Sequence, residues 1–317
     1  MEIKMRIKPG GKQVLETLSS SGNSISIPQT RISNEFNVEN ENPKIREIFK
    51  ELNDLIGLQN VKKIIHEIHA FIEIQKYRLR GELATEPTVL HAIFKGNPGT
   101  GKTTVARIVG KLFREIGVLP KGQLVEVERA DLVGEFIGHT AQKTREQLKK
   151  ALGGILFIDE AYSLARGGEK DFGKEAIDVL VKAMEDHKDE LIVILAGYKD
   201  EMEFFLKTNP GLRSRFPIHV LFPDYQIEEL MEIAQLMLAK RQYQLSDEAI
   251  IALEKIICRQ LLKGGEHSGN ARLIRNIVEF SIRRQAVRLI NKPKLTRDDL
   301  MIIESVDLLD NFPKYEH

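Results

Sequence analysis

The sequence lacks long apolar runs, has a single cysteine and carries no excess of charge of one sign. No stretch approaches the roughly 18 uninterrupted apolar residues that a membrane helix requires, so we do not expect a membrane protein. The lone Cys258 has no partner for an internal disulfide and is expected to be a small buried hydrophobe. Lysines and arginines number 47 and acidic residues 46, which disfavours a nucleic-acid binder without excluding a local basic patch.

The N-terminal segment has neither the features of a signal peptide nor those of a folded domain. It begins with basic residues but has no apolar core or cleavage site, so we expect a cytoplasmic protein. Residues 1–42 are rich in Ser, Asn and Gly without sustained periodicity, which predicts a flexible extension.

The apolar pattern of the remaining chain changes once. From Pro43 a helical period leads into five short apolar runs that alternate with helical segments. The runs are VLHAIFKG, QLVEVERA, GGILFIDEA, LIVILAGY and PIHVLF. This alternation predicts an α/β domain over 43–225, with a five-stranded parallel sheet and helices on both faces. After Asp224 the pattern is helical, with a capping box at Thr296 and Asp299; it predicts a small helical domain over 226–310 and a tail over 311–317.

The segment GNPGTGKT (96–103) fits the pattern G-x-x-x-x-G-K-[ST] and lies between a predicted strand and a predicted helix. Its glycines let backbone N–H groups turn toward phosphates, and the helix N-terminus adds positive charge. Lys102 is expected to reach the β- and γ-phosphates of ATP, and Thr103 to bind Mg²⁺. A glycine-rich turn without nucleotide is the disfavoured alternative. The expected nucleotide contacts are Asn97, Pro98, Gly99, Thr100, Gly101, Lys102, Thr103 and Thr104.

The segment GILFIDE (154–160) is an apolar strand that ends in two carboxylates. Such a strand brings Asp159 to the sheet edge beside the phosphate loop, where it can hold the Mg²⁺ shell. Glu160 is then the expected base that polarises the attacking water. Alone, the two acids would more simply mark a helix N-terminus; after a phosphate loop, the catalytic interpretation is favoured.

These two segments resemble the Walker A and Walker B motifs of the AAA+ superfamily, and the resemblance extends from about Asp54 to about Asp307. It implies that Ile56 and Gly57 contact the nucleotide, with a structural turn as the alternative. It also implies an arginine finger in LRSRF (212–216) and the sensor 2 motif of a helical lid in GNAR (269–272). More narrowly, DLVGEFIGHTAQKT, GGILFIDEAYSL, LAGYKDEM and NPGLRSRF resemble the family of stage V sporulation protein K and the red-type Rubisco activase, and sporulation protein K in particular.

The three arginines also make chemical sense. An arginine from a neighbouring subunit stabilises the charge of a phosphoryl group in transfer and raises the rate by about 10³ to 10⁵. Arg215 is the first candidate for this role and Arg213 the second, although one of the pair could be a surface charge only. Arg272 opens an amphipathic helix, so it either reads the nucleotide state and moves the lid or pairs with an acid. Tyr198 stands where many AAA+ proteins carry Asn, which leaves the orientation of the water open.

Phe136, Ile137 and Gly138 lie in a loop-like patch after a glycine. An exposed aromatic beside glycines is unusual unless it grips something, and the resemblance makes this segment a pore loop that contacts a client. The alternative is that Phe136 is a buried anchor of its helix. Residues 167–173 could form a second pore-facing loop or an ordinary surface loop.

Two classes of function fit these motifs. The first is a motor, a homo-oligomeric ring of six subunits that uses ATP to remodel an unidentified protein client, with a role in sporulation implied by the resemblance. The second is a switch or scaffold whose nucleotide sets an assembly state without turnover. Glu160 and the arginine pair favour the motor, because a switch has little use for a base. A nucleic-acid motor is a third, weaker possibility.

Overall fold

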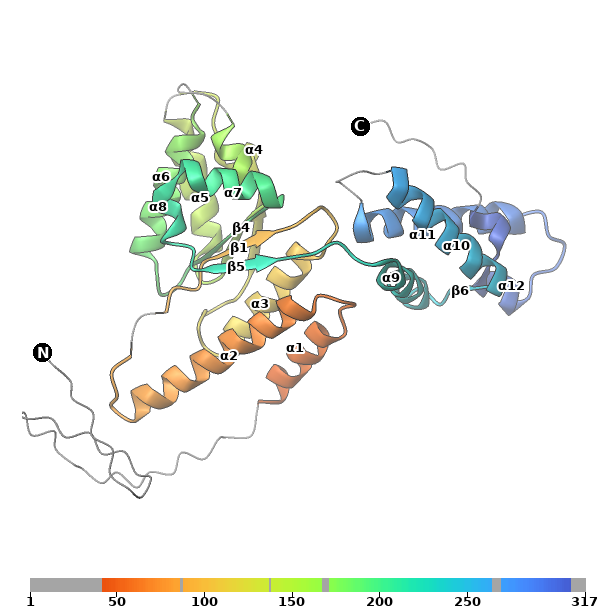
Figure 1. Cartoon of the computed structure of the whole chain (residues 1–317), viewed down its shortest axis with the longest axis horizontal. Helices are drawn as coiled ribbons and strands as arrows, with labels where there is room; N and C mark the ends of the chain where they lie inside the picture. Colours follow the sequence, from red (N-terminus) through yellow and green to blue (C-terminus); the bar gives the residue numbers. More distant parts are fainter. Residues whose placement is uncertain (1–41, 86–87, 137, 167–170, 264–268, 309–317) are drawn as a thin grey trace, which may run out of the picture. The chain divides into compact units, whose positions relative to one another are not determined.

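The computed structural model describes residues 42–85, 88–136, 138–166, 171–263 and 269–308. Its central element is a parallel sheet with the strand order β2-β3-β4-β1-β5, of which β4, β1 and β5 are labelled in Figure 1. The strands are β1 (Ala92–Lys95), β2 (Leu124–Val127), β3 (Ile155–Ile158), β4 (Ile192–Gly197) and β5 (Ile218–Leu221). The prediction of a five-stranded parallel sheet is confirmed.

Helices cover both faces of this sheet because the strands are apolar on both faces. Side chains alternate along a strand, so Ile155 and Phe157 of β3 pack into one cluster, while Leu156 and Ile158 pack into the other. The first cluster contains α1 (Pro43–Asn53), α2 (Gln59–Arg80) and α3 (Lys102–Glu115). The second contains α4 (Arg129–Leu132), α5 (His139–Ala151), the 3₁₀ helix η1 (Ala161–Ala165), α6 (Gly173–Asp186), α7 (Lys199–Thr208) and part of α8 (Pro210–Arg213).

The chain after β5 forms a helical unit with a core of its own. Its elements are α9 (Ile227–Ala239), β6 (Gln244–Leu245), α10 (Asp247–Lys263), α11 (Asn270–Leu289), α12 (Arg297–Met301), β7 (Ile302–Ile303) and the 3₁₀ helix η3 (Ser305–Leu308). The predicted capping box is present, because Thr296 and Asp299 each accept a hydrogen bond from the other's backbone N–H.

Two details of this helical unit differ from the expectation. The strands β6 and β7 pair in parallel over two residues each, a length too short to produce an alternating pattern in the sequence. Cys258 is only partly buried, whereas its neighbour Ile257 on α10 is fully buried. Within the described ranges, none of the helices is both long and apolar enough to cross a membrane.

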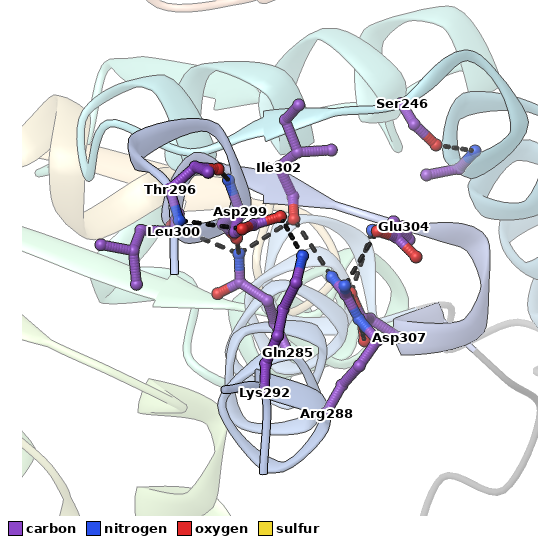
Figure 2. A network of polar contacts seen from close by, with 11 residues as sticks. Ser246, Gln285, Arg288, Lys292, Thr296, Asp299, Leu300, Ile302, Glu304 and Asp307 are labelled. Carbon is purple, nitrogen blue, oxygen red and sulfur yellow. Dashed lines mark hydrogen bonds and ion pairs between the residues drawn. The ribbon is translucent and has the colours of Figure 1, made fainter. Parts of the chain in front are cut away.

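A polar network holds the end of the helical unit against α11 (Figure 2). Arg288 donates to both carboxylate oxygens of Asp307, at 3.0 and 2.8 Å, and to Glu304 at 2.8 Å. The Asp307 side chain is only 2% exposed, so this ion pair is largely desolvated. Gln285 donates from the same helix to the backbone carbonyls of Asp299 and Ile302, at 3.1 and 2.9 Å. These bonds satisfy polar groups that the short strand β7 cannot pair alone.

Replacing Arg288 by Ala should lower the free energy of unfolding by about 2 to 4 kcal/mol, because it leaves the buried carboxylate of Asp307 without its cation. Urea denaturation of the full chain measures the loss. Arg283→Ala is the matched control, because Arg283 lies exposed on the same helix and should change stability by less than about 0.5 kcal/mol. Equal stability of the two variants would show that the Arg288 pair contributes nothing to the fold.

Candidate functional site

The phosphate loop joins β1 to α3 and depends on the conformations that its glycines allow. Gly99 and Gly101 have φ angles of +76° and +95°, which non-glycine residues rarely adopt. At Gly96 the limit is space, because a Cβ there would lie 2.3 Å from the carbonyl oxygen of Phe222. The loop therefore closes under the end of β5, with its backbone curved around the start of α3.

The side chain of Lys102 lies inside this loop. Its ammonium donates to the carbonyl oxygens of Gly96 and Asn97, at 2.8 and 2.9 Å. Burial lowers the pKa of Lys102, and the negative charge of Asp159 partly opposes the shift. A partly desolvated ammonium held by neutral carbonyls gains strongly from phosphate oxygens, so the loop presents Lys102 as an anion ligand.

One cavity of about 520 Å³ collects most of the residues that the sequence suggested. From that set it is lined by Ile56, Pro98, Gly99, Gly101, Lys102, Thr103, Thr104, Asp159, Glu160, Tyr198 and Arg272. These residues are far apart in the sequence, from Ile56 before α2 to Arg272 in the first turn of α11. The cavity also has an apolar part formed by Leu55, Leu58, Ile233, Leu236 and Met237; no local motif marks these residues, and the sequence reasoning missed them.

Three expected nucleotide contacts, Gly57, Asn97 and Thr100, do not line this cavity. Gly57 has a φ of +63° and packs so closely on Glu229 that a Cβ would lie 2.3 Å from its carboxylate. That arrangement is the structural turn left open by the sequence. The hydroxyl of Thr100 is fully buried and donates to the carbonyl of Asn97 at 2.8 Å, so it shapes the loop. The side chain of Asn97 donates to Asp224.

The two carboxylates follow directly after β3, at the carboxyl end of the sheet. Both are exposed to solvent, and Asp159 accepts a hydrogen bond from the backbone N–H of Glu160 at 3.0 Å. Glu160 has a φ of +45°, a left-handed conformation that costs a non-glycine residue about 1 to 3 kcal/mol and is concentrated at functional sites. Both carboxylates line the cavity.

Tyr198 follows β4 and lies close to Tyr162, with ring centroids 5.9 Å apart. Burial raises the pKa of both phenols, and the negative charge of Glu160 raises them further. Both hydroxyls therefore stay protonated at neutral pH and can donate hydrogen bonds. Tyr198 thus places a hydroxyl donor at the position where many AAA+ proteins carry the amide of an asparagine.

Arg213 and Arg215 lie outside this cavity. Arg215 is ion-paired with Glu185 of α6 and donates to the carbonyl of Gly211 at 2.9 Å. Arg213 is exposed at the end of α8. The cavity of this chain therefore contains Arg272 but neither of the two candidates for the finger.

The candidate pore loop lies between α4 and α5. Phe136 is 64% exposed, and its ring meets the edge of His139 with centroids 5.4 Å apart; this exposure excludes the buried anchor. Gly138 has a φ of +82° and precedes α5. Ile137 lies outside the described residues, as do residues 167–170 of the second candidate loop. Asp171, which follows them, is ion-paired with Arg129 at 2.5 Å.

A Mg²⁺ ion fits the oxygen donors of this cavity. Thr103 at the start of α3 and Asp159 after β3 supply a hydroxyl and a carboxylate to the lining of this cavity. Mg²⁺ in phosphate-transfer sites takes one or two such protein ligands and completes its shell with phosphates and water. Among the described residues no cluster of three or more His, Cys, Asp or Glu could hold a metal by itself.

Comparison with known proteins places this geometry in a family. The model for the "ATPase family associated with various cellular activities (AAA)" matches residues 92–224, and the model for the AAA lid domain matches residues 226–316. Stage V sporulation protein K of Bacillus subtilis (strain 168) is 57% identical over 83% of this chain and 82% of its own length.

Other relatives are similar over comparable lengths. Protein CbbX of Cereibacter sphaeroides is 49% identical over 80% of this chain and 82% of its own. The chloroplastic ribulose bisphosphate carboxylase/oxygenase activase of Cyanidioschyzon merolae is 44% identical over 90% and 98%.

Among solved structures, a Thermotoga maritima RuvB variant covers 81% of this chain and 69% of its own with a TM-score of 0.54. Its identity of 22% supports a shared fold. Together with the phosphate loop, the paired carboxylates after β3 and the lid arginine, these matches show that the chain belongs to the AAA ATPases, in the family that includes stage V sporulation protein K, CbbX and the Rubisco activase.

Proposed function

We propose that this AAA ATPase assembles into a ring of six subunits in the cytoplasm and couples ATP hydrolysis to the remodelling of a client protein, with a role in sporulation. The observation that carries the proposal is the division of the arginines. Arg272 lines the cavity of its own chain, whereas Arg213 and Arg215 lie outside it. Two arginines beyond their own nucleotide site suit a neighbouring site, which a ring supplies at every interface.

In this proposal the residues of the cavity divide the chemical work. Lys102 and the N-terminus of α3 bind the phosphates, and the apolar part of the cavity takes the base. Thr103 and Asp159 hold Mg²⁺, which neutralises charge on the β- and γ-phosphates when bound. Glu160 accepts the proton of the attacking water, and the protonated phenol of Tyr198 donates a hydrogen bond that orients the water or the γ-phosphate. Arg272 contacts the phosphates from the lid.

The proposed role in sporulation rests on the similarity to stage V sporulation protein K of Bacillus subtilis; the sequence does not name the client. The relative from Cyanidioschyzon merolae is named as the activase of an enzyme, ribulose bisphosphate carboxylase/oxygenase, which supports a protein client. A pull-down with the Glu160→Gln variant in the presence of ATP would trap such a client, because the ring would stay loaded. Recovery of the same proteins by Lys102→Ala, which should not bind nucleotide, would contradict ATP-dependent engagement.

Glu160→Gln should bind ATP with unchanged affinity and hydrolyse it about 10² to 10⁴ times more slowly, because the amide cannot accept the proton of the water. Calorimetry measures binding and phosphate release measures turnover. Lys102→Ala is the reference for lost binding, and Glu232→Gln, on an exposed face of α9, is the control for loss of a carboxylate. Normal turnover in Glu160→Gln would assign the base elsewhere; normal binding by Lys102→Ala would remove the phosphate-loop assignment.

Arg215→Ala should bind ATP normally and lose hydrolysis by a large factor, up to about 10³ to 10⁵, because the neighbouring site loses its cation. Mixing it with Lys102→Ala subunits should restore some activity. At a few interfaces, the intact phosphate loop of an Arg215→Ala subunit then meets the intact Arg215 of a Lys102→Ala subunit. Arg213→Ala, measured in parallel, identifies the finger, and Arg145→Ala on the exposed face of α5 is the control. If mixed rings form and no activity returns for either arginine, the arginines do not act between subunits.

Phe136→Ala should keep basal ATPase activity and the melting temperature, because the ring is 64% exposed and makes non-specific apolar contacts with a client. Stimulation of the ATPase by a client captured with Glu160→Gln should fall. Phe204→Ala is the matched control, since Phe204 on α7 is 68% exposed. Equal stimulation of the two variants would end the pore-loop interpretation.

A further inference from the structure

Two side chains from distant parts of the sequence, those of Asn97 and Asn270, meet at Asp224, which lies between β5 and α9. The amide nitrogen of Asn97 donates to both oxygens of this carboxylate, at 3.0 and 2.9 Å. The amide nitrogen of Asn270 donates to one of the same oxygens at 2.8 Å. Asn97 belongs to the phosphate loop, and Asn270 is the first residue of α11. Asp224 therefore joins the phosphate loop to the lid.

The lid side of this junction is firmly held. Asn270 is 1% exposed and has a φ of +46°, a conformation that asparagine tolerates better than most residues. Its side-chain oxygen accepts the backbone N–H of Tyr225 at 3.0 Å, so the amide has a fixed orientation with its nitrogen toward Asp224. Arg272 follows two residues later on the same helix. Its distance from the phosphate loop thus depends on where Asn270 is held.

Backbone contacts bring the same two segments together beside the carboxylate. The N–H of Ala271 donates to the carbonyl of Gly99 at 3.2 Å. A Cβ on Gly99 would lie 2.8 Å from the backbone nitrogen of Arg272, so this packing tolerates only glycine in the loop. The hydroxyl of Tyr225 donates to the carbonyl of Thr100 at 3.3 Å. A movement of the phosphate loop would therefore displace the first residues of α11.

The carboxylate of Asp224 receives both asparagines because each of its oxygens is an acceptor. Each Asn presents an NH₂ group, which is a donor, and a carboxylate has acceptors on both oxygens. An asparagine at position 224 would keep one acceptor oxygen for both partners, but its NH₂ group would replace the second oxygen and face the NH₂ group of Asn97, which loses that bond. The negative charge also strengthens the bonds, and it acts on Lys102, whose pKa it helps to hold up against burial.

We propose that Asp224 is a positioning residue that fixes Arg272 in register with the phosphate loop, so that phosphates entering the loop move the lid through the Asn97–Asp224–Asn270 junction. The proposal rests on the proposed roles of Lys102 and Arg272 in binding the phosphates. Asp224 itself does not line the nucleotide cavity. Its effect on hydrolysis passes through Arg272.

The test compares Asp224→Asn with Glu232→Gln in the full-length protein, by steady-state ATPase kinetics and thermal melting with and without ADP. For Asp224→Asn we expect kcat to fall about tenfold, which corresponds to about 1.4 kcal/mol of transition-state stabilisation. The KM for ATP should stay within about threefold, since Lys102 still binds the phosphates. The melting temperature without nucleotide should shift by less than about 2 °C, while the upward shift caused by ADP becomes smaller.

A double-mutant cycle separates positioning from a general loss of structure. Arg272→Ala should lower kcat by itself, and adding Asp224→Asn to it should cost little more, because the junction acts through that arginine. Additive losses would overturn the proposal, as would a kcat for Asp224→Asn equal to that of Glu232→Gln, or a drop in melting temperature that accounts for the lost activity.

Lys102→Ala keeps the two hypotheses apart. If Lys102→Ala loses nucleotide binding and Asp224→Asn behaves like the control, the junction hypothesis fails and the site assignment stands. If Lys102→Ala still binds ATP, the site assignment itself is wrong.

Discussion

The parallel pairing of β1, β3 and β4 is the constraint on which the site depends. Because neighbouring strands run in the same direction, their carboxyl ends meet at one edge, and each strand continues there into a functional segment. The phosphate loop follows β1, the two carboxylates follow β3, and Tyr198 follows β4. The backbone N–H of Gly96 donates to the carbonyl of Gly197 at 3.0 Å, which extends the pairing of β1 and β4 into the loop. Ligands of open parallel sheets bind at this edge.

Burial shifts the pKa values of Lys102, Tyr162 and Tyr198 at this edge of the sheet. The ammonium of Lys102 is held among carbonyls and loses solvation, which prepares it for an anion. The phenols of Tyr162 and Tyr198 stay protonated beside Glu160. The two carboxylates, in contrast, are exposed. Asp159 accepts a hydrogen bond from the backbone N–H of Glu160, and Glu160 has a left-handed backbone conformation. The ammonium of Lys102, the phenol of Tyr198 and the two carboxylates therefore line one cavity.

The lid depends on polar contacts at two places. At its far end Arg288 and Gln285 pair with Asp307 and with backbone carbonyls, which fixes the chain after α12 on α11. At the other end of α11, Asn270 meets Asp224. The same helix therefore connects a structural ion pair, the residues of the nucleotide cavity and the phosphate loop. Hydrogen bonds with fixed partners define such an arrangement more sharply than apolar packing does.

The sequence by itself determined the parallel α/β fold, the phosphate loop, the positions of Asp159 and Glu160 and the presence of a separate helical unit. These features depend on local patterns, because strand periodicity, glycine spacing and a strand ending in carboxylates are read within a few residues. The exposure of Phe136 was also anticipated, since glycines beside an aromatic indicate a loop.

Only the tertiary structure decided which residues share the nucleotide cavity. It turned Gly57 into a packing turn against Glu229 and directed the hydroxyl of Thr100 to the loop's own backbone. It brought Ile233 and Met237 of the lid to the cavity and joined Asn97 to Asp224 and Asn270. Several of these contacts link residues far apart in the sequence, such as Asn97 and Asp224, which are 127 positions apart. No local pattern in the sequence marks these long-range contacts, because they form where the lid helices meet the phosphate loop.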